Sequence, residues 1–204
     1  MKKNRNPKIL KLPIILPIGT LVIVGWLFIL SSFYEPSWIF DWAGIRPEIR
    51  DTVKLVDKYG SITSGSVGIE ARTPQEWYTR IWLMKNADED ELKTLLAYPK
   101  GAVKATAYEG LIKKPNATSK FDLIYQALND TTTFIHYQSG CVGEPLLVGE
   151  YLIDHVTGIS GRLRPFSPES VMKYNLSDEE INTLMELYHK RMNKKDEYLK
   201  KNYQ

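Results

Sequence analysis

The sequence contains one cysteine, Cys141, which is flanked by glycines in the run 139–143 and has His136 and His155 nearby along the chain. A histidine can lower the pKa of a thiol, and glycine N–H groups can hold an oxyanion, so this pattern could support nucleophilic catalysis. Free cysteine is also among the most buried residue types. We expect Cys141 to pack in the core, and a hydrolase that uses Cys141 is the alternative.

Acidic and histidine residues gather between positions 136 and 155, where Glu144, Glu150 and Asp154 accompany the two histidines. Glu150 and Asp154 would lie one helical turn apart and could face a cation together. No H-E-x-x-H spacing is present, so the sequence predicts no metal site. The cluster of His136, Glu150 and His155 remains a second route to the alternative hydrolase.

Other common sites are also missing from the sequence. No glycine-rich phosphate loop occurs, and one cysteine excludes an internal disulfide framework. The net charge of +3 comes from the N-terminus, because five basic residues in 1–11 precede the first acid, and acids slightly outnumber bases from residue 34 onward. We therefore predict no enzyme activity, no catalytic residue, no cofactor, no nucleic-acid partner and no evident small-molecule substrate.

The segment 12–33 contains no charged residue and is rich in leucine, isoleucine, valine, tryptophan and phenylalanine. A helix of this length spans roughly 33 Å, and a bilayer has a hydrocarbon core of about 30 Å. We predict an uncleaved single-pass transmembrane helix, a signal-anchor, that binds the lipid bilayer. A cleaved signal peptide and a buried core helix are the alternatives, although no A-x-A cleavage pattern follows the segment.

The positive charge before this segment predicts its orientation in the cell membrane. Residues 1–11 should stay in the cytoplasm, and the domain 46–204 should lie on the outer, periplasmic or extracellular, side. Residues 34–45 form an aromatic juxtamembrane linker, in which Tyr34, Trp38 and Trp42 could lie in the headgroup layer or pack on the domain.

Helix signals dominate the chain from residue 46 onward. Pro47 suits a first helical turn and Gly60 suits a helix end, whereas Thr73 and Glu76 fit a capping box. The segment 61–72 is predicted to be a loop or weak hairpin, and 134–141 is a short run of uncertain type. The predicted class is all-α. Further helix starts are expected at Asp88, Gly101, Ser119 and Ser177.

Two segments align at an offset of about one helix pair, which places Val103 opposite Ile135. Residues 98–111, a turn and a helix with Lys104 where an arginine is usual, together with the turn 128–131 and the run 138–141, resemble HEAT-like (armadillo-type) repeats. They are also similar to short bacterial HEAT-like proteins of unassigned function. The resemblance covers roughly 77–155 and implies a short α-solenoid of antiparallel helix pairs, with helices 46–59 and 177–198 as caps.

The resulting hypothesis is a membrane-anchored, non-enzymatic helical-repeat module for protein interaction or scaffolding. The runner-up is the membrane-tethered hydrolase, and a structural subunit of an envelope complex is a third possibility. The protein partner is unknown. Because tryptophan, tyrosine and arginine are over-represented in binding anchors, the candidate partner-binding residues are Trp77, Tyr78, Arg80, Trp82, Tyr108 and Tyr137.

Overall fold

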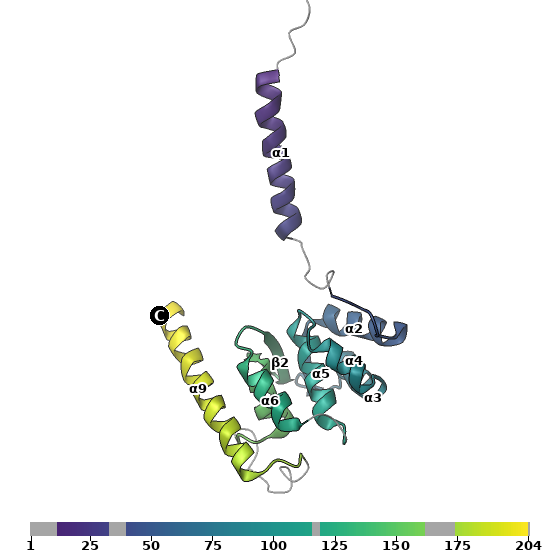
Figure 1. Ribbon diagram of the computed structural model, residues 1–204, viewed down its shortest axis with the longest axis vertical. Helices are drawn as coiled ribbons and strands as arrows, with labels where there is room; N and C mark the ends of the chain where they lie inside the picture. Colours follow the sequence, from purple (N-terminus) through teal and green to yellow (C-terminus); the bar gives the residue numbers. More distant parts are fainter. Residues whose placement is uncertain (1–11, 33–39, 116–118, 162–173, 204) are drawn as a thin grey trace, which may run out of the picture. The chain divides into compact units, whose positions relative to one another are not determined.

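The computed structural model describes residues 12–32, 40–115, 119–161 and 174–203 (Figure 1). The chain divides into two compact units, Met1–Trp38 and Ile39–Gln204. The first unit contains helix α1, Leu12–Ser32. The basic stretch 1–11 and the linker residues Tyr34 and Trp38 lie outside the described residues.

Helix α1 covers most of the segment that the sequence predicted to cross the membrane. In the part of the chain that the structure describes, no helix combines the length and the apolar character that a membrane span requires. The prediction of a transmembrane signal-anchor at 12–33, with a single-pass location in the cell membrane, is therefore wrong.

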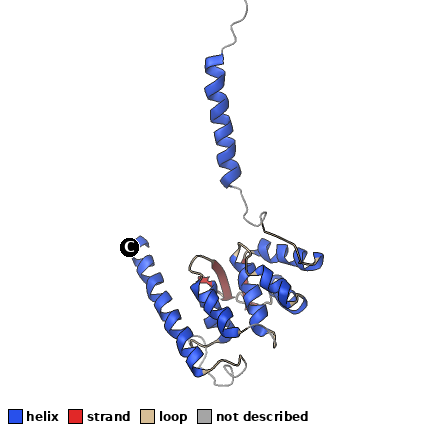
Figure 2. Ribbon diagram, in the orientation of Figure 1, coloured by secondary structure: helices blue, strands red, loops and turns tan. Residues whose placement is uncertain are grey.

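The second unit combines helices with a small β-sheet, as Figure 2 shows. The predicted all-α class is therefore wrong. The elements in chain order are α2 (Pro47–Tyr59), β1 (Ser61–Val67), α3 (Gln75–Asn86), α4 (Glu89–Leu95), α5 (Gly101–Lys113), α6 (Lys120–Asn129), β2 (Phe134–Gly140), β3 (Val142–Leu147), α7 (Val148–Tyr151), the π-helix η2 (Leu152–Thr157) and α9 (Asp178–Tyr203).

The sheet has the strand order β1-β2-β3 and is mixed. Strand β1 runs parallel to β2, with Ile62 opposite Tyr137, whereas β2 and β3 form an antiparallel hairpin. The hairpin turns at Gly140 and Cys141, and Gly140 has a φ of +55°, a backbone conformation that glycine adopts without strain. The sequence did not predict β1 because this serine- and glycine-rich strand acquires its hydrogen bonds from a distant segment.

One face of the sheet packs against the helices and the other is more open to solvent. Ile62, Ile135 and Leu146 are buried on the inner face, whereas His136, which is paired with Pro145, is exposed on the opposite face. Successive side chains of a strand alternate between the two faces of a sheet, which explains this division. The inner face contacts α5 and α7, so the sheet and the helices share one core.

Local helix signals were read correctly at several positions. Gly60 ends α2 with a φ of +67°, and Asp88 caps α4 in a capping box with Glu91. The predicted capping box at Thr73 is wrong, because α3 begins at Gln75 and the Thr73 hydroxyl donates instead to the carbonyl oxygen of Gly65 at 2.7 Å. The threonine therefore contacts the strand rather than the helix.

The predicted pure α-solenoid is also wrong, because the second of the two aligned segments changes type. Residues 101–113 are helical, as expected, but the corresponding segment Phe134–Gly140 is a strand. The two segments are nevertheless neighbours: a Cβ placed on Gly101 would lie 2.1 Å from the carbonyl oxygen of Phe134. Helix α5 therefore approaches β2 so closely that only glycine fits at this position.

Trp42, which the sequence placed in the linker, belongs to the second unit and packs within it. Its ring lies 5.9 Å from that of Tyr98 and 4.9 Å from that of Phe40, and the Arg50 guanidinium lies 5.0 Å from its centroid. Of the two interpretations of this aromatic residue, the structure favours the packed linker. At the other end of the chain, α9 lies beside α6 (Figure 1).

Candidate functional site

The structure separates the six candidate partner-binding residues into three groups. Tyr78 and Trp82 are exposed, at 51% and 42% of their surface. Trp77 and Tyr137 are half-buried. Arg80 and Tyr108 are buried, each at 3% exposure, so neither can contact a partner directly.

Tyr78 and Trp82 lie on the outer face of α3. Because they are four residues apart, they occupy neighbouring positions on one side of the helix. The half-buried Trp77 supports this face: its ring meets that of Tyr78 edge to face at a centroid distance of 5.2 Å, and its indole lies 3.4 Å from the position that a Cβ of Gly65 would take. Strand β1 thus holds Trp77 in place beside the exposed pair.

The inner face of α3 carries Arg80, which is at the centre of a buried polar network. Its Nε donates to Thr106 Oγ1 on α5 and its Nη1 donates to the Thr63 carbonyl on β1, each at 3.1 Å. Its Nη2 pairs with Glu109 on α5 and donates to the Tyr151 hydroxyl on α7 at 2.9 Å. The Tyr151 hydroxyl in turn donates to Glu109 Oε2 at 2.7 Å. One side chain therefore joins three helices and a strand.

The charges in this network hold one another in their ionised forms. Burial alone would raise the pKa of Glu109, but the positive charges of Arg80 and Lys113 outweigh this effect and lower the pKa below its ordinary value. Burial likewise opposes the charge of Arg80, yet its pKa is raised, because Tyr151 and Glu109 outweigh the burial. Burial raises the pKa of Tyr151 well above its usual range, so the phenol stays neutral and donates its proton. We conclude that the network fixes the packing of α3.

Side chains from the network and from the loop before α3 cover part of the outer edge of β1. Arg80 donates a hydrogen bond to the carbonyl oxygen of Thr63, and the hydroxyl of Thr73 donates one to the carbonyl oxygen of Gly65. On the other outer strand, β3, Pro145 offers no N–H for a further strand. Both edges of the sheet are thus poorly suited to strand addition by a partner, and the exposed aromatic pair on α3 is the better candidate for binding.

Sequence reasoning missed Thr63, Thr106, Glu109 and Tyr151 as partners of Arg80. One signal was available: Glu109 lies in the apolar stretch 102–112 and Arg80 lies on the stripe of α3 that carries Leu83 and Met84. Charged residues at core positions of two neighbouring helices indicate a buried ion pair, because an isolated buried charge is too costly.

The residues of the alternative hydrolase do not come together. Cys141, which we expected in the core, is exposed in the turn between β2 and β3. His136 and Tyr137 are consecutive on β2 and so point to opposite faces of the sheet. The His155 ring packs on Tyr137 at a centroid distance of 3.9 Å, which places it on the face opposite to His136. Over the described residues, no group of three or more His, Cys, Asp or Glu side chains could hold a metal ion.

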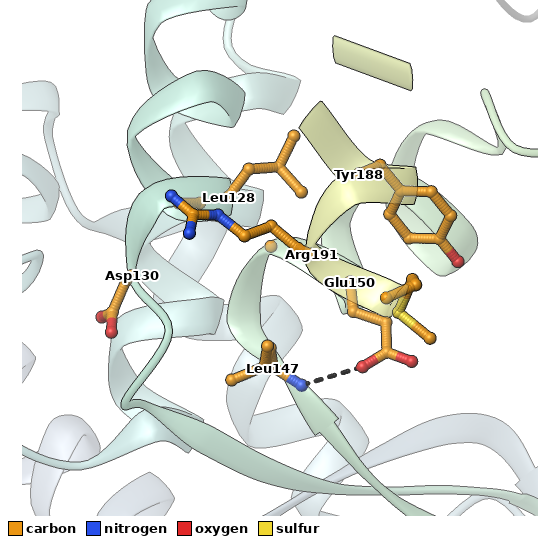
Figure 3. A pocket seen from close by; sticks show the side chains of 9 residues that line it. Leu128, Asp130, Leu147, Glu150, Tyr188 and Arg191 are labelled. Carbon is orange, nitrogen blue, oxygen red and sulfur yellow. Dashed lines mark hydrogen bonds between the residues drawn. The ribbon is translucent and has the colours of Figure 1, made fainter. Parts of the chain in front are cut away.

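Glu150, the third residue of that cluster, lies beside a small cavity between α6, α7 and α9. Its Oε2 accepts a hydrogen bond from the Leu147 N–H at 3.2 Å, which Figure 3 shows as a dashed line. The cavity volume is about 10 Å³, which is room for roughly one water molecule. A space of this size is far below the volume that a small-molecule ligand requires. Its lining residues are Ala127, Leu128, Asp130, Leu147, Gly149, Glu150, Tyr188, Arg191 and Met192.

The resemblance to HEAT-like repeats rests on the turn and helix 98–111 and the segments that follow it, and it stays a prediction. In the structure, Lys104 of this stretch forms an ion pair with Asp130 at 3.0 Å and thereby connects α5 to the turn after α6. No protein-family model, curated protein or solved structure matches the chain.

Proposed function

We propose that the unit Ile39–Gln204 is a non-enzymatic protein-interaction module that binds its partner through the outer face of α3. The observation that carries this proposal is the exposure of Tyr78 and Trp82 on one side of a helix. Large aromatic side chains provide much contact area for little conformational entropy, and they dominate the energy of many interfaces.

The rigidity of α3 supports the proposal. Arg80 fixes the inner face of the helix to α5, α7 and β1, and Trp77 rests on Gly65. The exposed pair Tyr78 and Trp82 is therefore presented by a helix that is held on its other sides. A surface ordered before binding loses less entropy when a partner docks, so such a surface binds more tightly for the same contacts.

The membrane-tethered hydrolase gains no support from the geometry. The two histidines named for it lie on opposite faces of the sheet, and the ring of His136 lies against Gly143, 2.9 Å from the position of a Cβ at that residue. A thiol-reactive probe offers a direct test. A catalytic thiolate should react far faster than free cysteine at neutral pH, whereas an exposed structural thiol should react at a similar rate.

Site-specific photo-cross-linking in the full chain tests the proposal. A photoreactive amino acid at position 82 should yield a discrete adduct in the cells that produce the protein. The same amino acid at position 125 is the matched control, because Trp82 and Tyr125 are both 42% exposed on helices of the same unit. Position 125 should give no such adduct.

The companion variant Tyr78→Ser should reduce the adduct formed from position 82 without changing the circular dichroism spectrum or the melting temperature. Equal adducts from positions 82 and 125, or an adduct from position 82 that survives Tyr78→Ser at full yield, would contradict the role of this face. A complete absence of adducts from position 82 would argue equally against it.

A further inference from the structure

We draw no further inference here: the strongest candidate, the exposed apolar surface of α1 from Leu21 to Ile29, carries nothing because the described residues do not show what covers it.

Discussion

Among the described residues of the second unit, two arginine–glutamate pairs connect segments that are distant in sequence, and they differ in their access to water. The Arg80–Glu109 pair is enclosed, with side chains 4% and 7% exposed. In the Arg46–Glu91 pair, the glutamate is 2% exposed but the arginine is 48% exposed. The first pair connects α3 to α5, and the second connects the residue before α2 to the first turn of α4.

The Arg46–Glu91 pair, called the outer pair, is stabilised by hydrogen bonds from backbone N–H groups as well as by the attraction of its charges. Arg46 donates from Nε and Nη2 to the two Glu91 carboxylate oxygens at 3.0 and 2.7 Å, and its backbone N–H donates at 2.9 Å. The backbone N–H of Asp88 adds a fourth bond at 3.0 Å. The side-chain hydrogen bond from Arg46 is the largest cause that lowers the pKa of Glu91 to about 2.

The comparison shows how burial changes what an ion pair requires. The arginine of the outer pair keeps part of its hydration, and beside that arginine side chain its partner Glu91 accepts, among the described residues, only from the backbone N–H groups of Arg46 and Asp88. Both charges of the Arg80–Glu109 pair, called the inner pair, are buried. The cost of removing them from water is offset only because Thr63, Thr106 and Tyr151 provide the remaining hydrogen-bond partners. The inner pair should therefore be the more sensitive to the loss of one member.

The largest effect is expected for Arg80→Ala, which leaves Glu109 buried with Lys113 as its remaining cationic partner. Removing one member of a buried pair costs about 3–5 kcal/mol of unfolding free energy. Urea denaturation at neutral pH, followed by circular dichroism, measures this loss.

The double variant Arg80→Met with Glu109→Leu is the control, because it removes both charges and keeps apolar volume in the core. Replacing a whole buried pair is often neutral, so the double variant should be more stable than Arg80→Ala. If the double variant is the less stable of the two, the charges themselves stabilise the fold and the comparison above is wrong.

A smaller loss is expected for Tyr151→Phe, which removes the hydroxyl between Arg80 and Glu109 and keeps the ring. The loss of one hydrogen bond to buried charged groups lowers the free energy of unfolding by about 1–3 kcal/mol. The same chemical change at the exposed Tyr78 is the matched control and should be neutral in denaturation. Equal stability of the two variants would show that the hydroxyl of Tyr151 contributes nothing.

The outer pair should control part of the stability in acid. The pKa of Glu91 is about 2 in the folded chain and 4.5 ordinarily, so the carboxylate contributes stability that is fully present above pH 4.5 and is lost as the pH falls towards 2. Glu91→Gln should cost about 2 kcal/mol at neutral pH. The stability of this variant should also fall less steeply than that of the wild type between pH 4.5 and 2.

Melting temperatures of wild type and Glu91→Gln, measured across that pH interval, test this prediction. The pKa of Glu109 is also lowered, so the variant should keep some acid sensitivity of the same sign. Parallel curves for the two proteins would mean that Glu91 does not titrate as the geometry implies.

The smallest effect is expected at the exposed ion pair of Lys93 and Glu89, whose atoms are 2.7 Å apart on the surface of α4. Exposed pairs of this kind contribute little because solvent screens the charges. Lys93→Met should leave the melting temperature unchanged within experimental error. A marked decrease would show that charge alone, without burial, stabilises these helices.

The limits of sequence reasoning are clearest around α3. The sequence predicted a helix start at residues 73–76, and α3 begins there, at Gln75, but Arg80 was grouped with Tyr78 and Trp82 as a binding residue. Helical periodicity shows which residues lie on the same side of a helix. It does not show which side faces the core when aromatic and charged residues occur on both sides. Contacts with β1 and α5, which are distant in sequence, decide that question.

By itself, the sequence determined where several helices begin and end. The helix starts at Asp88 and Ser177 and the helix end at Gly60 could be predicted because each cap satisfies backbone groups within a few residues. The pairing of β1 with β2 and the set of partners around Arg80 were decided by tertiary structure. A parallel strand and a buried charge both depend on partners from remote segments, and those partners become neighbours only after the chain has folded.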